Sequence, residues 1–473
     1  MFRWHYFSSC AVAILSLLMQ EMNRVTRFLT LILGSSAPSE TRFSSVAGPS
    51  SSASGGGGTT LTLNHRYGPC SPVPSEKRPI SDEELLRRDQ LRAEYIRRKL
   101  SRSNGTAGED GGQQSKVTVP TTLGTSLDTL EYVISVGLGS PAVKQMMCID
   151  TGSDVSWVQC KPCPIPPCHA AGSLFDPAAS STYAAFNCSA AACKQLGKHA
   201  NGCDSKSQCQ YIVRYGDDSN TTGTYGSDKL TLSASDVVEG FQFGCSHAEL
   251  GTGMNDKIDG LMGLGGGAQS LVSQTAANYG KSFSYCLPPT AASSGFLTLG
   301  ARSSGGGGNG TSQFVTTPML RVKESPTFYF AALKDIAVGG KKLGLPPSVF
   351  SAGSLMDSGT IITRLPPTAY SALSSAFQAG MKQYKKAQPS SIFDTCFDFT
   401  GLDKITIPAV ALVFSGGAVV DLDAHGILHR SCLAFAPNAD EKTFSTIGNV
   451  QQRTFEVLYD VGSSVFGFRA GAC

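Results

Sequence analysis

The sequence has little charge and no long apolar run, and each absence narrows the class of protein. Charged residues make up 16% of the 473 residues, and the formal net charge is +3. So small a positive excess gives no basis for a nucleic-acid-binding protein. The apolar runs at residues 11–19 and 28–33 are shorter than the roughly 20 residues that a transmembrane helix needs. We therefore expect no specific nucleic-acid partner and no transmembrane segment.

Long helical heptads are also absent, whereas glycine, serine and threonine are abundant. The sequence contains 52 glycines, and its apolar content of 41% is ordinary for a globular protein. This composition favours an all-β protein with many turns. The chain is long enough for two or three domains.

The N-terminal residues have the composition of targeting and linker segments. Arg3 and His5 precede the first apolar run, as in a secretory signal peptide. Residues 35–54 are rich in serine and poor in acids, so a plastid transit peptide is the alternative. We assign residues 1–37 to a signal or targeting segment and residues 38–59 to a low-complexity linker.

The sequence has 15 cysteines, and only Cys10 and Cys70 precede Cys148. This density is typical of an oxidising compartment. Cys160 and Cys163 have the spacing of a metal knuckle, but no second CxxC or HxxxH motif follows, so zinc is the weaker interpretation. Sequons for glycosylation also fit a secreted glycoprotein. They are Asn104, Asn187, Asn220 and Asn309.

Two tetrapeptides with one pattern lie in different halves of the chain. Asp150-Thr151-Gly152-Ser153 and Asp357-Ser358-Gly359-Thr360 each place a hydroxyl residue, a glycine and a hydroxyl residue after an aspartate. Apolar residues precede both, which predicts a buried strand that runs into a tight turn. One copy per half indicates two related units that each offer a carboxylate to a shared site.

These motifs resemble those of the pepsin-like aspartic proteases, most closely the cysteine-rich plant branch of nepenthesin-like and chloroplast-nucleoid-type proteases. The resemblance covers about residues 131–473. It implies a bilobal all-β fold of two pseudo-symmetric β-barrel-like lobes, 127–315 and 316–473, with the active-site cleft between them. The segments 260–263 and 446–448 resemble the apolar-apolar-glycine strand beside each catalytic loop.

The resemblance implies an aspartic endopeptidase that hydrolyses protein or peptide substrates at acid pH, as a monomer without a cofactor or metal. The candidate catalytic residues are Asp150 and Asp357. Two carboxylates held close together share one proton, because both cannot ionise cheaply. The ionised one takes a proton from water while the protonated one donates to the scissile carbonyl.

The other motif residues are expected to support the carboxylates. By resemblance, the first hydroxyl residues cross-link the two loops and the last ones bond the outer carboxylate oxygens. The glycines let main-chain N–H groups approach the carboxylates. In this order the pairs are Thr151 and Ser358, Ser153 and Thr360, and Gly152 and Gly359.

The segment around Tyr215 and Gly216 resembles the flap hairpin that closes over the substrate in this family. Tyr215 matches the flap tyrosine, and Trp157 matches the tryptophan that supports it. Plant relatives usually have glycine where Asp218 stands, so we expect a stiffer turn or a raised pKa of the catalytic pair.

Disulfide connectivity does not follow from spacing, but the family pattern implies a set of pairs. Cys148 is left over, and we expect a buried small apolar residue there, with a regulatory thiol as the alternative. The implied pairs are Cys160–Cys163, Cys168–Cys245, Cys188–Cys209, Cys193–Cys203, Cys286–Cys473 and Cys396–Cys432.

Helical periodicity and an excess of basic residues coincide between residues 76 and 102. Ser81 and Glu84 have capping-box spacing, and apolar residues recur from Leu85 to Leu100. A solvated surface helix is one interpretation. We favour an inhibitory propeptide, assigned to residues 60–126, because a protease-like domain follows and the basic helix would lie across an acidic cleft.

We therefore predict a zymogen that is secreted to the apoplast or sent to the vacuole, with the chloroplast as the alternative. Two other functions stay open. One is a non-catalytic binder with the protease fold, similar to glycosidase inhibitors. The other is DNA association of a plastid protease through residues 87–102.

Overall fold

The structure is a computed structural model, and its described residues belong to one compact unit within residues 57–473. It describes residues 61–65, 82–100, 117–122, 132–163, 174–216, 219–250, 258–287, 294–301, 313–402 and 404–472. The predicted targeting segment and linker, Asp218, Asn104 and Asn309 lie outside these residues.

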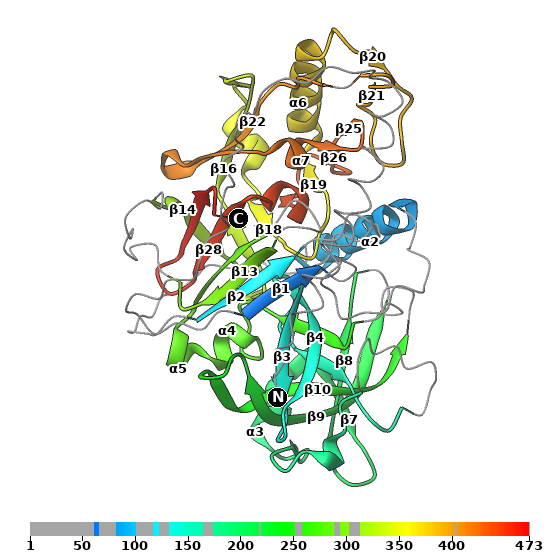
Figure 1. Ribbon diagram of the computed structural model, residues 1–473, viewed down its shortest axis with the longest axis vertical. Helices are drawn as coiled ribbons and strands as arrows, with labels where there is room; N and C mark the ends of the chain where they lie inside the picture. The colour runs from blue at the N-terminus through cyan, green and yellow to red at the C-terminus, as the bar shows by residue number, and fades with distance from the viewer. Residues whose placement is uncertain are drawn as a thin grey trace, which may run out of the picture. The chain divides into compact units, whose positions relative to one another are not determined.

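β-Strands dominate both halves of this unit, which confirms the all-β prediction, and the strands form two lobes (Figure 1). The N-terminal lobe contains β3 (Tyr132–Leu138), β4 (Val143–Asp150), β5 (Trp157–Gln159), β6 (Ala184–Ala185), β7 (Ala200–Cys203), β8 (Cys209–Arg214), β9 (Asn220–Thr231), β10 (Val237–Leu250) and β11 (Gly260–Gly263). Its short helices are α3 (Ala191–Gln195), α4 (Leu271–Gln274) and α5 (Ala276–Tyr279).

The C-terminal lobe combines short strands with α6 (Pro367–Gly380) and α7 (Ala424–Ile427). Its strands are β15 (Tyr329–Ala331), β16 (Leu333–Val338), β17 (Lys341–Lys342), β18 (Ser354–Met356), β19 (Thr363–Leu365), β20 (Lys385–Lys386), β21 (Phe397–Asp398), β22 (Val410–Phe414), β23 (Val419–Asp421), β24 (Leu428–His429), β25 (Cys432–Leu433), β26 (Phe435–Pro437) and β27 (Ser445–Ile447).

A shared sheet joins the lobes. Phe283 of its strand β12 stacks on Tyr459 of the neighbouring β28, with ring centroids 4.4 Å apart. This aromatic layer fills the interior where the two halves meet. This sheet is 21-stranded and also contains most strands of the two lobes. Its strands at the junction are β1 (Leu61–His65), β2 (Val117–Thr122), β12 (Ser282–Cys286), β13 (Ser294–Leu299), β14 (Val315–Arg321), β28 (Phe455–Asp460) and β29 (Val465–Ala470).

The same strand arrangement surrounds both aspartate motifs. β4 ends at Asp150 and pairs in parallel with β11, and β18 ends just before Asp357 and pairs in parallel with β27. These partners are the two predicted apolar-apolar-glycine strands, which confirms that interpretation. β5 and β19 then follow, and each pairs antiparallel with that same partner strand. The two halves therefore repeat one unit.

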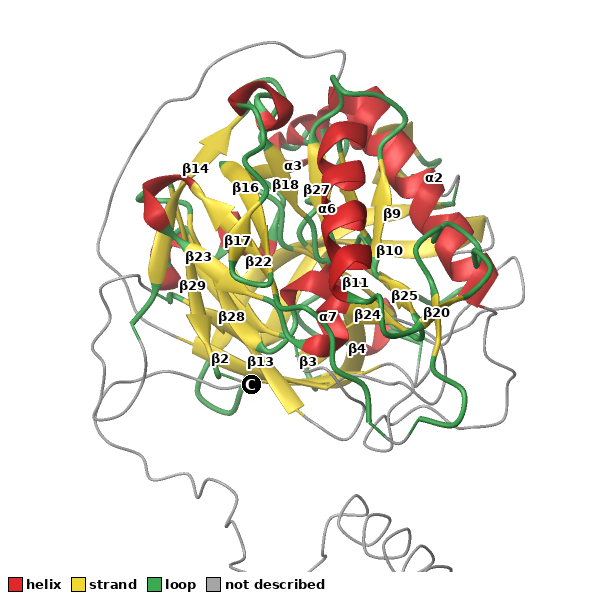
Figure 2. Ribbon diagram, turned by 90° about the horizontal axis from the view of Figure 1, so that it is seen from above, coloured by secondary structure: helices red, strands yellow, loops and turns green. Residues whose placement is uncertain are grey.

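The predicted basic helix is present as α2 (Asp82–Leu100), seen beside β18 and β19 in Figure 1 and as a long helix in Figure 2. Leu85, Leu86 and Ile96 are buried, so its apolar face packs on the protein and is not solvated. Glu84 forms ion pairs with exposed Arg87 and with Arg88. Among the helices of the described ranges, none is long and apolar enough to cross a membrane.

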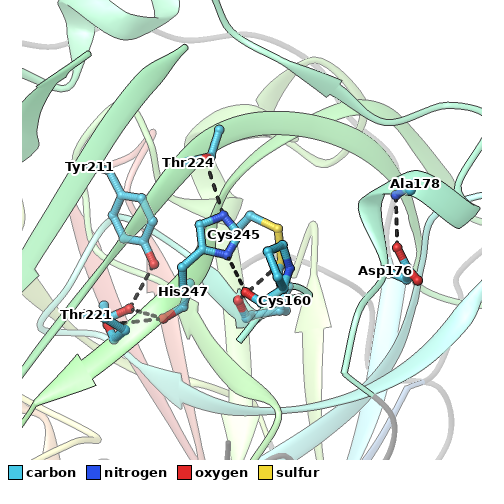
Figure 3. The surroundings of a disulfide bond; sticks show 12 residues. Cys160, Asp176, Ala178, Tyr211, Thr221, Thr224, Cys245 and His247 are labelled. Atoms are coloured by element: carbon cyan, nitrogen blue, oxygen red, sulfur yellow. Dashed lines mark hydrogen bonds between the residues drawn. A yellow bond between two sulfur atoms is a disulfide. The ribbon is translucent and has the colours of Figure 1, made fainter. Parts of the chain in front are cut away.

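The disulfide pattern of the N-terminal lobe differs from the implied one. The structure has Cys160–Cys245, Cys188–Cys203 and Cys193–Cys209, so the pairs Cys160–Cys163, Cys168–Cys245, Cys188–Cys209 and Cys193–Cys203 were wrong. The physical reason is strand register, because β10 runs parallel to β5 and brings Cys245 beside the end of that strand (Figure 3). The spacing of cysteines in the sequence does not show which strands lie side by side.

Other cysteines agree with the prediction. Cys396–Cys432 is present, and Cys286 is disulfide-bonded, although its predicted partner Cys473 lies outside the described residues. Cys160 and Cys163 are both oxidised, which removes the thiolates that the zinc interpretation needs. Cys148 is a buried thiol on β4.

The two sequons inside the described ranges differ in accessibility. Asn187 is exposed, whereas Asn220 is half-buried at the start of β9. An attached glycan needs a surface position, so Asn187 is the better placed of the two.

Candidate active site

The two aspartates meet at the junction of the lobes. Asp150 is 3% exposed and Asp357 is fully buried. Asp150 is the last residue of β4 and Asp357 directly follows β18, and both strands are buried at this end, so the sheet of each lobe fixes the start of its loop. The loops then turn toward each other, as the sequence predicts.

Hydroxyl groups cross-link the loops as the resemblance implies. Ser358 N–H donates to Thr151 Oγ1 at 2.9 Å, and Thr151 N–H donates to Ser358 Oγ at 3.2 Å. The bonds are reciprocal, so each hydroxyl accepts from the main chain of the opposite lobe. Because these groups are buried, loss of one hydroxyl leaves a buried N–H without its acceptor.

Each carboxylate is held from its own loop. Ser153 Oγ donates to Asp150 Oδ2 at 2.7 Å, and Thr360 Oγ1 donates to Asp357 Oδ2 at 2.5 Å. The inner oxygens accept from main-chain N–H groups of the motif glycines, at 2.9 Å from Gly152 and 3.2 Å from Gly359. All six support residues therefore lie where the sequence analysis places them.

The motif glycines also leave room for an approach from the opposite side. A Cβ on Gly152 would lie 3.0 Å from Asp357 Oδ1, and one on Gly359 would lie 2.7 Å from Asp150 Oδ1. The nearest atom to either Cβ would be Arg92 Nη2, at 2.5 Å. A side chain at either position would displace this group and crowd the opposite carboxylate, so both positions need glycine for packing.

A cation from outside the motifs occupies the space between the carboxylates. Arg92 of α2 donates from Nη2 to Asp150 Oδ1 at 2.7 Å and to Asp357 Oδ1 at 2.8 Å. Its Nε also donates to Asp357 Oδ2 at 3.0 Å. One guanidinium thus bridges the inner oxygens of both carboxylates with charge-assisted bonds.

The cation changes the protonation of the site. Burial favours a protonated Asp150, but the Arg92 guanidinium and the Ser153 and Gly152 donors outweigh it and hold the pKa of Asp150 below its ordinary value. Burial also opposes the charge on Arg92, yet the two carboxylates raise its pKa. Asp150 is therefore ionised and neutralised by Arg92 rather than sharing a proton.

The segment predicted to be the flap contacts the same helix. Trp157 Nε1 donates to Tyr215 OH at 2.6 Å, the contact that the resemblance implies. A Cβ on Gly216 would lie 2.5 Å from the Arg92 Cα, so the flap backbone rests directly on α2. Tyr95 OH donates to the Arg214 carbonyl at 3.0 Å. Between the flap and the carboxylates, α2 fills the cleft.

One acidic residue of α2 is anchored by the C-terminal lobe. Asp89 forms a buried ion pair with Arg364 Nη2 at 2.8 Å and accepts from Ile361 N–H at 2.5 Å. Burial raises the pKa of Asp89 even though the Arg364 guanidinium acts in the opposite direction. Asp89 lies one helical turn before Arg92, so both charges project from one face of the helix.

Sequence reasoning did not single out Arg92, Asp89 or Arg364. A signal for the first two exists, because residues 85, 89, 92 and 96 follow helical spacing and place two charges within the apolar stripe. Charges on a buried face need partners of opposite sign. For Arg364 no local signal exists, since its partner lies far away in sequence.

Comparisons with known proteins agree with this geometry. Residues 132–301 match the family described as xylanase inhibitor N-terminal, and residues 328–470 match xylanase inhibitor C-terminal. An aspartyl protease family protein of Arabidopsis thaliana is 42% identical over 88% of this chain and 87% of its own length. Aspartic proteinase nepenthesin-2 of Nepenthes gracilis is 32% identical over 72% of this chain and 78% of its own.

A solved structure shares the fold. Basic 7S globulin from soybean aligns with a TM-score of 0.59 at 19% identity, covering 76% of this chain and 95% of that one. The fold and the paired loops thus define a bilobal, pepsin-like β protein. The chain belongs to the plant aspartyl protease family.

Proposed function

We propose that the protein is an aspartic endopeptidase synthesised as a zymogen, with Asp150 and Asp357 as its catalytic pair. The observation that carries the proposal is the site itself. Two buried carboxylates face each other, and each is held by a main-chain N–H and a hydroxyl of its own loop. The curated relatives named as aspartyl proteases support the same activity.

The proposed mechanism is based on the position of Arg92 between the two carboxylates. Arg92 Nη2 lies within hydrogen-bond distance of both inner oxygens, where a water held by both carboxylates would lie. Without the cation, the two carboxylates must share a proton. The ionised one then takes a proton from the water as it attacks the peptide carbonyl. The protonated one donates to the carbonyl oxygen, and the flap with Tyr215 covers the substrate.

In this proposal α2 is the inhibitory part of a propeptide. It neutralises the catalytic pair through Arg92, and its Tyr95 contacts the flap at Arg214. Acid weakens this block by protonating Asp150 once the pH falls through its lowered pKa. Removal of the segment then opens the cleft.

The two disulfides within residues 188–209 of the N-terminal lobe and the match to nepenthesin-2 support membership of the nepenthesin-like branch. The disulfides fit a secreted or vacuolar protein. The proposal also includes a propeptide, a monomeric protein and a glycan on Asn187.

The second candidate is a non-catalytic binder, and the descriptions of the matching family models favour it as an alternative. In that case the protein would bind a glycosidase such as a xylanase. The intact carboxylate pair weighs against it, because a binder needs no such machinery.

The test is hydrolysis of an unstructured protein by the acid-treated full-length chain from about pH 3 to 7, with and without pepstatin. The matched control is Asp150→Asn, which keeps the shape of the side chain. Acid-dependent cleavage that both treatments abolish supports the proposal. An inactive, correctly disulfide-bonded protein that inhibits a xylanase equally well with Asp150→Asn supports the alternative.

A further inference from the structure

The carboxylate of Asp89 fills a pocket whose donors all belong to the C-terminal lobe. Ile361 N–H donates to Oδ1 at 2.5 Å, and Ile362 N–H donates to Oδ2 at 3.4 Å. Arg364 Nη2 donates to Oδ2 at 2.8 Å. Asp89 and Arg364 are each 3% exposed, so the contact is sealed from solvent.

None of these donors belongs to α2. Ile361 and Ile362 directly follow the second aspartate motif, and Arg364 belongs to β19, which β26 and β27 flank. Within the described ranges, Arg364 forms one ion pair, which is with Asp89. The buried Nε of Arg364 has no hydrogen-bond partner in these ranges. α2 itself closes this pocket, so the guanidinium and the two main-chain donors meet water once α2 leaves. A segment that covers the pocket again would bury the guanidinium, and a buried guanidinium without an anion is costly. A covering segment that carries an acidic side chain is therefore favoured.

The surroundings of the pocket strengthen that preference. Ile361, Phe393 and Val450 form a buried apolar cluster with Leu86 of α2. In such surroundings a charge pair is less screened than in water. An acidic group is the partner that satisfies the guanidinium and the two main-chain donors together.

The repeat of the two halves places Arg364 on the wall of the cleft. Trp157 and Arg364 each stand seven residues after their motif aspartate, on the equivalent strands β5 and β19. Trp157 donates toward the flap, on the N-terminal side of the cleft. Arg364 donates toward the segment that occupies the cleft, which is where a substrate would lie.

We propose that this pocket binds an acidic side chain of the substrate once the pro-segment has left, which makes Arg364 a specificity-determining residue. The proposal rests on the endopeptidase function proposed above. Asp89 precedes Arg92, the residue on the catalytic pair, by three residues, which is about 4.5 Å along the helix axis. An extended chain advances about 3.3 Å per residue. The preferred Asp or Glu therefore lies within about three residues of the scissile bond.

The experiment compares fluorogenic peptides that differ by Glu against Gln at one position, scanned over three residues on each side of the bond. The acid-matured enzyme is assayed at about pH 5.5, where a free Glu is mostly ionised. At one position, the kcat/KM for Glu should exceed that for Gln about tenfold or more, the size of one charge-assisted hydrogen bond. A Lys peptide at that position should be the poorest substrate.

Variants assign the preference to the pocket. Arg364→Gln should bring the Glu-to-Gln ratio close to one while the Gln peptide is still cleaved. Lys382→Gln, the same charge change at an exposed site of that lobe, should leave the ratio unchanged. If Arg364→Gln does not fold, Arg364→Lys should keep a reduced ratio, because Lys retains the charge without the planar fork.

The outcomes separate the two proposals. Equal cleavage of Glu and Gln peptides at every position would refute the acidic subsite and leave the endopeptidase intact. A Glu preference that survives in Arg364→Gln would refute the assignment to this pocket. Failure to cleave either peptide, together with no cleavage of unstructured protein, would overturn the proposed function and the preference that rests on it.

Discussion

The contact between Arg92 and the two aspartates predicts that a single substitution in α2 removes latency. In Arg92→Gln, three charge-assisted hydrogen bonds to two buried carboxylates are lost. Removing one partner of a buried ion pair typically costs about 3–5 kcal/mol. At about 1.4 kcal/mol per factor of ten, the pro-segment binds the cleft weaker by roughly 10²-fold to a few times 10³-fold.

The assay is hydrolysis of a quenched protein substrate by the full-length chain at about pH 6, before any acid treatment. The wild-type chain should show no hydrolysis, and Arg92→Gln should hydrolyse the substrate without acid treatment. The matched control is Arg87→Gln on the same helix, because the Arg87 side chain is 52% exposed and contacts Glu84. An exposed pair contributes at most about 1 kcal/mol, so this variant should stay silent.

A second control ties the activity to the catalytic pair, since Asp150→Asn added to Arg92→Gln should abolish all cleavage. Two results would refute the reasoning. One is an Arg92→Gln zymogen as latent as wild type. The other is equal activation by Arg87→Gln, which would mean that any charge loss on α2 loosens the helix.

Three further outcomes follow from the same geometry. The pKa of Asp150 is lower when α2 is bound than when it is not. The contact with Arg92 therefore stabilises the zymogen fully at a pH above the ordinary pKa of Asp150, and this stabilisation is lost as the pH falls through the lowered pKa. Amide hydrogen exchange in α2 should therefore become faster on acidification. In Trp157→Phe, the bond to Tyr215 is lost, so kcat/KM should fall about tenfold, and the melting temperature should also fall because Trp157 is fully buried; an unchanged kcat/KM would contradict a role in holding the flap. Thr151→Val removes the acceptor of the Ser358 N–H, so the free energy of unfolding should drop by about 1–3 kcal/mol in denaturant titrations, and Thr151→Ser should restore it.

The sequence predicts those parts of the structure that short motifs encode. The two aspartate loops, their hydroxyl cross-link, the flap tyrosine with its tryptophan and the strands beside the loops all lie within a few residues of a readable pattern. The helix over residues 82–100 is likewise visible in its periodicity. In each case the interaction repeats a local arrangement that the family motif already contains.

The parts that were missed depend on contacts between distant segments. The ion pair of Asp89 and Arg364 joins residues 275 positions apart. The sequence around either residue does not indicate that the two form a pair. The wrong cysteine pairs have the same cause, because Cys245 meets Cys160 through parallel strands 85 residues apart. Register between such strands is set by packing and not by spacing.

The bridge that Arg92 makes has a consequence for the order of events during biosynthesis. Asp150 and Asp357 come from different lobes, so the arginine finds both acceptors only after the second lobe has folded and met the first. The two aspartates also come together only at that point. Because α2 precedes both lobes in the chain, Arg92 has already been synthesised when the two carboxylates first meet and can bind them from then on.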